Sequence, residues 1–250
     1  MSFWDHLEAL RGTIFRSILA VCLCAVLGFV FKRALFDAIL LPASPDFFIY
    51  RLLGWDFSLE LINVEVAAQF FVHLQAAFGA GLIIAFPYVV WELWRFIAPA
   101  LYAGEKRPVR AAFLMAAGLF YLGAAVGYCL VLPACVQFFL NYSVSERIIN
   151  TITIGSYMSM FSSTVLMVGA AFELPTVIWL LSRIGVLTRG QLRKGRRYAL
   201  VAVLAIAAVV TPADPLSMLI VAAPLYLLYE ISILLCSKSP EMSEENGSAA

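Results

Sequence analysis

One acidic residue, Glu173, lies inside a long apolar stretch of this sequence, at 157–182. At a rise of 1.5 Å per helical residue, its carboxyl group would lie about 14 Å from the nearer end of that stretch, close to the middle of a bilayer. A charged carboxylate at that depth is costly unless it faces an interior polar site or takes up a proton. Pro175 lacks an N–H group and so leaves the Ala171 carbonyl without its helical partner. Two interpretations stay open: a functional polar site, and a neutral Glu173 hydrogen-bonded to that carbonyl.

The other reactive residue types form no catalytic or metal-binding pattern. His6 and His73 are the two histidines, and they are too far apart in sequence to suggest a metal site. Cys129 and Cys135 could pair, but the five cysteines lack the regular spacing of a disulfide framework, and packing roles are favoured. Nucleophile motifs, Gly-rich phosphate loops and HExxH signatures are absent from the sequence. We therefore expect no enzymatic activity, no cofactor and no metal.

The composition defines the class of protein. The 250 residues are 63% hydrophobic and 13% charged, with a mean hydropathy of +0.92, whereas soluble domains are about 45–50% apolar. Several runs approach the roughly 18–20 apolar residues that cross a bilayer as a helix, and none shows the alternating pattern of a membrane barrel. The net charge of +1 gives no field that would attract nucleic acid. The sequence thus predicts an all-α membrane protein.

The apolar runs predict six transmembrane helices in one polytopic membrane domain, 1–236, followed by a disordered cytoplasmic tail, 237–250. The last two helices are short. The helix at 198–210 would extend about 20 Å against a hydrocarbon core of about 30 Å, so we expect a thinned bilayer or a re-entrant hairpin there. The predicted helices lie at roughly 13–31, 67–91, 111–132, 157–182, 198–210 and 216–235.

Prolines and carboxylates interrupt the sequence between the first two predicted helices. This composition suits an ordered external cap that lies partly at the membrane interface. The aromatic residues that fit such a depth are Phe47, Phe48, Tyr50 and Trp55.

The distribution of positive charge predicts the orientation. Of the 17 Lys and Arg residues, four lie on one side of the predicted helices and the rest on the other; the four are Lys32, Arg33, Arg51 and Arg147. Because cytoplasmic loops retain basic residues, both termini are expected in the cytoplasm.

Five stretches resemble the TatC family in order and spacing. The resemblance implies a six-helix, cup-shaped receptor in the bacterial cytoplasmic (inner) membrane, which binds Arg-Arg signal peptides of folded precursor proteins. It also implies single-helix partners of the TatA and TatB types, self-association and use of the proton-motive force. The stretches are HLEALR at 6–11, WRFIAPALYAGEKR at 94–107, FYLGAAVGYCLVLPACVQFF at 120–139, AAFELP at 170–175 and RRYALVAVLAIAAVVTPADPLSMLIVAAPLYLLYEIS at 196–232.

The resemblance also implies which residues bind the signal. An Arg-Arg motif presents two planar guanidinium groups, each able to pair with a carboxylate. Glu105 is the leading acceptor by resemblance, with Phe96 as an apolar contact and Glu92 as the second carboxylate. The residues alone favour a different interpretation, in which Glu105 forms a surface ion pair with Lys106 or Arg110.

Four further positions complete the predicted sites. In the N-terminal motif, Arg11 follows Ala9, where the family usually has a carboxylate, and the nearest carboxylate is Glu8. Glu8 and Arg11 are therefore included among the signal-binding residues. Glu173 and Asp214 are expected to be polar or assembly positions within the membrane, although Asp214 in TPADP also fits a simple turn cap.

A transporter is the main alternative function. A proton-coupled small-molecule secondary transporter could use Glu173 as its proton relay. The absence of an internal repeat and of a second firmly intramembrane carboxylate argues against it. Copurification with an Arg-Arg precursor would separate the two functions.

The charge count generates a topology prediction. Alkaline phosphatase is active only outside the cytoplasm, so a fusion after Lys238 should be inactive and a matched fusion after Arg147 should be active. Activity of the Lys238 fusion would reverse the orientation.

Overall fold

The computed structural model describes residues 3–54, 59–101, 107–143, 145, 150–183, 185–210 and 215–236. In these ranges the chain is helical apart from one pair of two-residue strands. The elements are α1 (Phe3–Val30), α2 (Lys32–Leu40), η1 (Leu41–Ala43), α3 (Phe48–Leu53), β1 (Leu61–Ile62), α4 (Ala68–Leu101), α5 (Arg107–Val126), η2 (Gly127–Val131), α6 (Leu132–Asn141), β2 (Ile152–Thr153), α7 (Ile154–Ala171), α8 (Leu174–Arg183), α9 (Arg189–Lys194), α10 (Arg196–Val210) and α11 (Pro215–Leu235).

The all-α prediction is confirmed, and every predicted helix has a counterpart. Within the described residues, four helical segments are long and apolar enough to cross a membrane: Leu7–Val30, Ala68–Phe96, Phe113–Asn141 and Ile154–Ser182. The apolar part of α11, Met218–Leu234, is shorter.

The predicted helix ends were wrong in three places. The first helix begins at Phe3 instead of 13, the second continues to Leu101 instead of 91, and the third runs on through η2 and α6 to Asn141. At α1 the backbone hydrogen bonds continue into the polar residues before position 13, which hydropathy does not mark, whereas α4 and α6 continue past Glu92 and Pro133, where the predicted helices stop. As a consequence, α4 extends past Phe96 to Leu101.

Prolines interrupt two of the long helices. Ahead of Pro133 the helix widens into a π-helical turn, η2, in which the Leu132 N–H donates to the Gly127 carbonyl. Ahead of Pro175, α7 ends at Ala171 and α8 begins at Leu174. There the Glu173 N–H donates to the Ala170 carbonyl at 3.1 Å, a tighter turn than an α-helix makes. The expected disturbance at Pro175 is therefore confirmed.

Tyrosine hydroxyls satisfy carbonyls that prolines leave free. Pro87 has no N–H for the Ile83 carbonyl, and Tyr121 of α5 donates to that oxygen at 3.1 Å. Pro42 likewise has no N–H group for the Ala38 carbonyl, and the Tyr128 hydroxyl of η2 donates to that oxygen at 2.6 Å. Each contact meets a backbone requirement and joins segments that are far apart in sequence.

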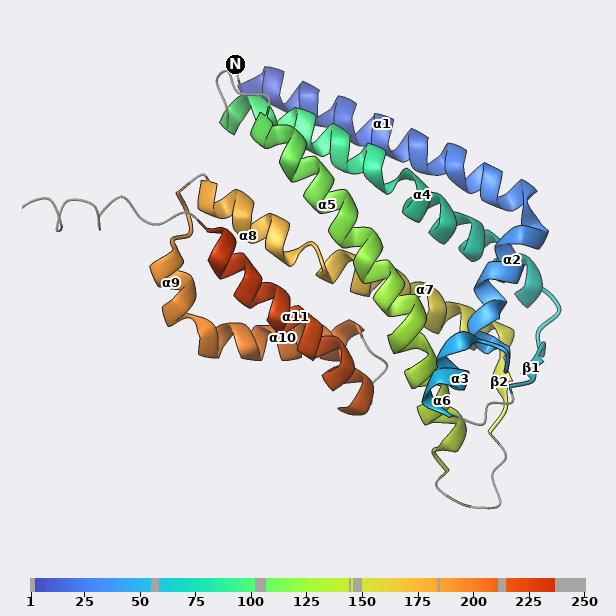
Figure 1. Cartoon of the computed structure of the whole chain (residues 1–250). Coiled ribbons are helices and arrows are strands. Elements are labelled where there is room, and N and C mark those ends of the chain that lie inside the picture. The colour runs from blue at the N-terminus through green and yellow to red at the C-terminus, as the bar shows by residue number, and fades with distance from the viewer. Residues whose placement is uncertain are drawn as a thin grey trace, which may run out of the picture.

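Small residues bring the long helices together. The helices α1 and α4 lie side by side in Figure 1 and pack along their length. A Cβ on Gly81 of α4 would lie 2.6 Å from the Ala25 nitrogen of α1, and one on Gly28 would lie 3.4 Å from the Ala77 carbonyl oxygen. Without a hydrophobic force between helices in lipid, such close backbone approach supplies the packing energy.

The predicted ordered cap is present between α1 and α4. It comprises α2, η1, α3 and β1, and β1 pairs in parallel with β2. Figure 1 shows it at the end of the molecule opposite the N-terminus. Tyr50 donates to the Pro42 carbonyl at 2.6 Å, and Tyr157 of α7 donates to the Ile39 carbonyl at 2.8 Å. Burial raises the pKa of Tyr50 far above its ordinary value, so the hydroxyl stays a donor.

The cap aromatics differ from the expected interface positions. Phe47 and Tyr50 are 2% and 1% exposed and form part of the cap core, whereas Phe48 is exposed. Trp55 lies outside the described residues. The hydroxyl and ring contacts of the cap bury these side chains, which no local sequence pattern could indicate.

The C-terminal helices form a second packed unit. The helix α10 packs on α11, and α11 packs on α8. Tyr229 of α11 donates to the Leu192 carbonyl of α9 at 2.8 Å, and Arg196 pairs with Glu230 at 2.6 Å. A capping box formed by Thr188 and Gln191 begins α9.

Close packing of α5 on α7 and α8 generates a stability prediction. A Cβ on Gly123 would lie 2.6 Å from the Phe172 Cβ, whereas one on Gly118 would meet nothing within 4 Å. We expect Gly123→Ala to lower the free energy of unfolding by about 1–3 kcal/mol, because the helices must move apart. Gly118→Ala, on the same helix, should instead raise it by about 0.5–1 kcal/mol, because Ala has the higher helix propensity and meets no obstacle there.

Unfolding in mixed detergent micelles, followed by circular dichroism, measures both variants. Equal stability of the two variants would contradict a close contact at Gly123.

Candidate functional site

A buried carboxylate joins α1 to α4. The Glu92 side chain is 3% exposed, and both Nε and Nη2 of Arg16 lie 2.8 Å from its Oε2. Arg95, one turn further along α4, has its Nη1 3.8 Å from Oε1. A carboxylate this buried must be compensated, because an unpaired buried charge is strongly destabilising. Glu92 therefore already has cationic partners within the chain.

An open cleft of about 370 Å³ adjoins this ion pair, where residues near the start of α1 meet Arg95 and Phe96 of α4. It brings together two of the predicted signal-binding residues, Glu8 from α1 and Phe96 from α4. Its lining residues are Glu8, Ala9, Gly12, Thr13, Arg16, Arg95 and Phe96.

Glu8 differs from Glu92 in its surroundings. Its side chain is exposed, and no ion pair or hydrogen bond of its carboxylate occurs in the part of the chain that the structure describes. Glu8 can therefore accept a cation without giving up an existing partner.

Arg11 does not line this cleft. It borders a neighbouring groove of about 700 Å³ along α1, which shares Glu8 and Gly12 with the cleft and is otherwise lined mainly by apolar residues such as Leu7 and Phe15. Two other predicted residues, Glu105 in 102–106 and Asp214 in 211–214, lie outside the described residues.

Glu173 lies in the interruption between α7 and α8, far along the chain from the α1–α4 cleft. Its Oε1 is buried and has no hydrogen-bond partner among the described residues, and the same holds for the Thr176 hydroxyl. The carbonyl freed by Pro175 therefore does not satisfy Oε1, and none of the described tyrosines caps that carbonyl as Tyr121 and Tyr128 cap theirs. This leaves a small polar region inside an apolar helix pair.

Comparison with known proteins identifies the family. Residues 5–224 match the family model of the Sec-independent protein translocase protein, TatC. The chain belongs to the TatC family.

Relatives and solved structures cover nearly the whole chain. The TatC protein of Blattabacterium sp. subsp. Periplaneta americana is 32% identical over 249 aligned positions, and the match covers 93% of this chain and 94% of the relative. That of Deinococcus radiodurans is 34% identical over 234 residues, 93% and 84% of the two chains. A crystal structure described as the twin arginine translocase receptor TatC in DDM has a TM-score of 0.78 at 33% identity, over 93% of this chain and 99% of its own.

Membership of the TatC family confirms the resemblance seen in the five sequence stretches. It establishes a multi-pass membrane protein that is a component of Sec-independent protein translocation. The roles of individual residues stay predictions.

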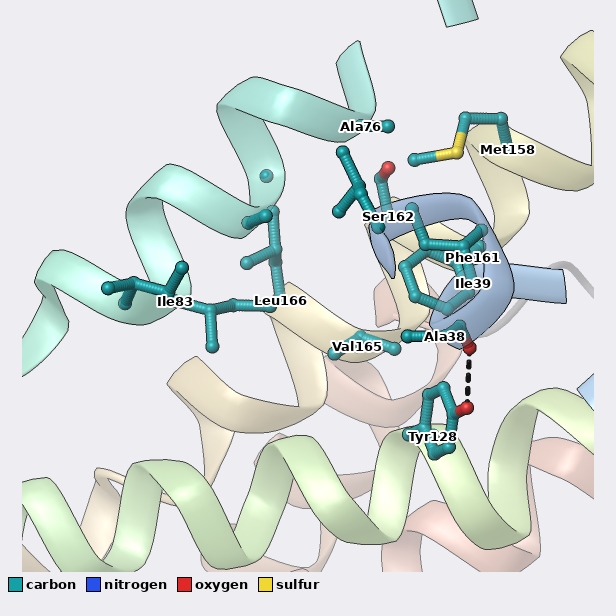
Figure 2. A pocket seen from close by; sticks show the side chains of 14 residues that line it. Ala38, Ile39, Ala76, Ile83, Tyr128, Met158, Phe161, Ser162, Val165 and Leu166 are labelled. Carbon is teal, nitrogen blue, oxygen red and sulfur yellow. Dashed lines mark hydrogen bonds between the residues drawn. The ribbon is translucent and has the colours of Figure 1, made fainter. Parts of the chain in front are cut away.

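A second cavity has an apolar lining. Figure 2 shows it between α2, α4, η2 and α7, with a volume of about 170 Å³. The Tyr128 hydroxyl closes one side by donating to the Ala38 carbonyl. Ser162 contributes a buried hydroxyl that has no hydrogen-bond partner among the described residues. Acyl chains fill such spaces in a bilayer, so the cavity by itself indicates no particular ligand.

Sequence reasoning missed the part that Arg16 plays. The sequence indicates Arg16 only as one of the basic residues that predict the orientation. Arg16 lies 76 positions from Glu92, and no local pattern connects the two. The contact between Arg95 and Glu92 could have been predicted from the sequence, because residues three apart on a helix are neighbours.

Proposed function

We propose that the chain is the receptor and core subunit of a twin-arginine translocase. It binds Arg-Arg signal peptides of folded precursors and exports these proteins, together with TatA-type and TatB-type partners, by using the proton-motive force. In this proposal the protein is no enzyme, six helices cross the bacterial inner membrane as a cup, and both termini are cytoplasmic. Family membership and the likeness to solved TatC receptors support it.

The observation that carries the proposal is the cleft at the α1–α4 end. It combines the exposed carboxylate of Glu8, which has no ion-pair partner among the described residues, with the half-exposed ring of Phe96. A guanidinium group needs a carboxylate for its charge and a planar apolar surface for its faces, and this pair offers both.

Charge in the cleft limits how a signal can bind. Arg16 and Arg95 compensate Glu92, so Glu8 alone supplies an uncompensated negative charge among the described lining residues. Two arginines need a second carboxylate. In our proposal Glu105, which follows α4 in sequence, is the leading acceptor, and the carboxylates at the cleft, Glu8 and Glu92, bind the other arginine.

Charge reversal tests the receptor function. Glu105→Lys replaces an acceptor with a repelling donor, so crosslinking of an Arg-Arg precursor should fall by about tenfold or more. Glu8→Lys should also lower it, and Glu105→Gln should have a milder effect. The readout is photo-crosslinking of a precursor signal to membranes with equal amounts of each variant.

Glu60→Lys is the matched control, because it makes the same charge change on an exposed residue of the cap. A precursor with Lys-Lys in place of Arg-Arg reports non-specific attraction. Undiminished crosslinking in both the Glu8 and Glu105 lysine variants would refute the proposed receptor site.

Glu173 generates a prediction about a later step. Its carboxyl group lies about ten residues from the end of α8, too far for pairing with a motif bound at the α1–α4 cleft. Glu173→Ala should therefore keep precursor crosslinking and lose most transport, because the polar contact inside the membrane is removed.

Glu173→Gln separates a proton-transfer role from a polar-contact role, since the amide keeps hydrogen bonding and cannot ionise. Near-normal transport by the Gln variant would exclude obligatory proton transfer at this residue, and with it the transporter alternative. Normal transport by the Ala variant would mean that Glu173 is merely tolerated.

A further inference from the structure

The Glu92 carboxylate already binds a guanidinium group, that of Arg16. Two nitrogens of this one side chain lie 2.8 Å from Oε2. Fixed planar donors on a carboxylate are also the way in which a protein binds an arginine from another molecule. The α1–α4 junction thus contains a formed guanidinium site with an occupant supplied by the chain itself.

The two partners of this pair are unequally buried. Glu92 is 3% exposed, so it must keep a cation at all times. The Arg16 side chain is 45% exposed and lines the cleft, so it can leave Glu92 for water at little cost. Gly12 makes room for it, because a Cβ there would lie 3.3 Å from Arg16 Nη1. Arg16 is therefore the partner that can be exchanged.

We propose that Arg16 occupies a guanidinium subsite on Glu92 in the unliganded protein, and that an arginine of the signal peptide displaces it. The inference rests on the receptor function proposed above. One guanidinium lies on Glu92 before and after the exchange, so the buried carboxylate is never left unpaired. A lysine ammonium is a point charge without a planar fork, so it competes poorly with Arg16.

The exchange explains how a cationic peptide enters a cleft with little net charge. The cleft and its floor hold two carboxylates, Glu8 and Glu92, and two guanidinium groups, Arg16 and Arg95. Because the charges nearly cancel, the electrostatic field of the cleft does not by itself attract a cation. Glu8 offers the first contact, and Glu92 then becomes available only to a group that outcompetes Arg16.

Peptide affinity tests the exchange directly. The full chain in lipid nanodiscs is titrated into a fluorescent synthetic Arg-Arg signal peptide, and anisotropy gives the Kd. Arg16→Gln vacates the subsite and should tighten binding by about tenfold, the worth of a charge-assisted hydrogen bond. Arg95→Gln removes the same charge from the same cleft, but Arg95 is 69% exposed and 3.8 Å from Glu92. It should tighten binding by only about twofold. A Lys-Lys peptide should gain little from either variant.

Chemical rescue tests the subsite without any signal peptide. Arg16→Ala leaves Glu92 unpaired, so its thermal unfolding temperature should fall, and methylguanidinium should raise it again in a saturable manner. Methylammonium should act weakly, and Arg16→Ala/Glu92→Gln should not respond to either ion. If Arg16→Ala does not fold, Arg16→Lys retains a cation and is tested for stabilisation by the same two ions.

The two experiments separate the outcomes. Equal affinity gains for Arg16→Gln and Arg95→Gln, or no saturable rescue by methylguanidinium, would overturn the exchange and leave Arg16 as a structural clamp. Rescue that depends on Glu92, together with no binding of the Arg-Arg peptide to the unmodified protein, would instead overturn the receptor function and the exchange that rests on it.

Discussion

A polar group inside a bilayer has no water to bind, and this constraint governs the structure. Prolines strengthen this constraint, both in the long helix α4 and in the cap, because each one removes a donor from the backbone. Tyr121 compensates for Pro87 and Tyr128 for Pro42, each from a different helical segment. The contacts that satisfy these carbonyls therefore also determine which segments lie together. At Pro175 no tyrosine of the described chain does this, and the polar residue Glu173 lies at that same interruption.

In the helix pair α1–α4, close packing and an ion pair hold the two helices together at different positions. Along its length, small residues such as Gly28 and Gly81 allow the backbones to touch, which is the main source of helix association in lipid. At one end, the pair formed by Arg16 and Glu92 joins the helices through a buried charge. Such a pair costs desolvation energy, so its value is in geometry and selectivity more than in stability.

Two polar regions in different parts of the fold suit the proposed function, in which the protein first recognises a motif and then moves its cargo. The α1–α4 cleft lies where α1 begins, and its carboxylates match cationic ligands. The region around Glu173 is enclosed by α7 and α8, with apolar surroundings. Because the two regions share no residues, substitutions can affect recognition and transport separately.

The sequence by itself determined the class, the helices and the family. Apolar runs and Pro175 are local features, so the helical segments and the backbone carbonyl that Pro175 leaves free followed directly from them, whereas the division of 157–182 into α7 and α8 did not. The five stretches that resemble TatC were enough for the family, since order and spacing are properties of the chain.

Only the tertiary structure decided the pairing of polar groups. Glu92 was predicted as a free acceptor for a signal, but Arg16 holds it from another helix. Glu8 borders both the cleft and the neighbouring groove, while Arg11, three residues along the same helix, borders only the groove. Pairing of this kind depends on how two helices are rotated about their axes, and that rotation is set by close contacts such as Gly81 on Ala25, which lie far from the charges in sequence.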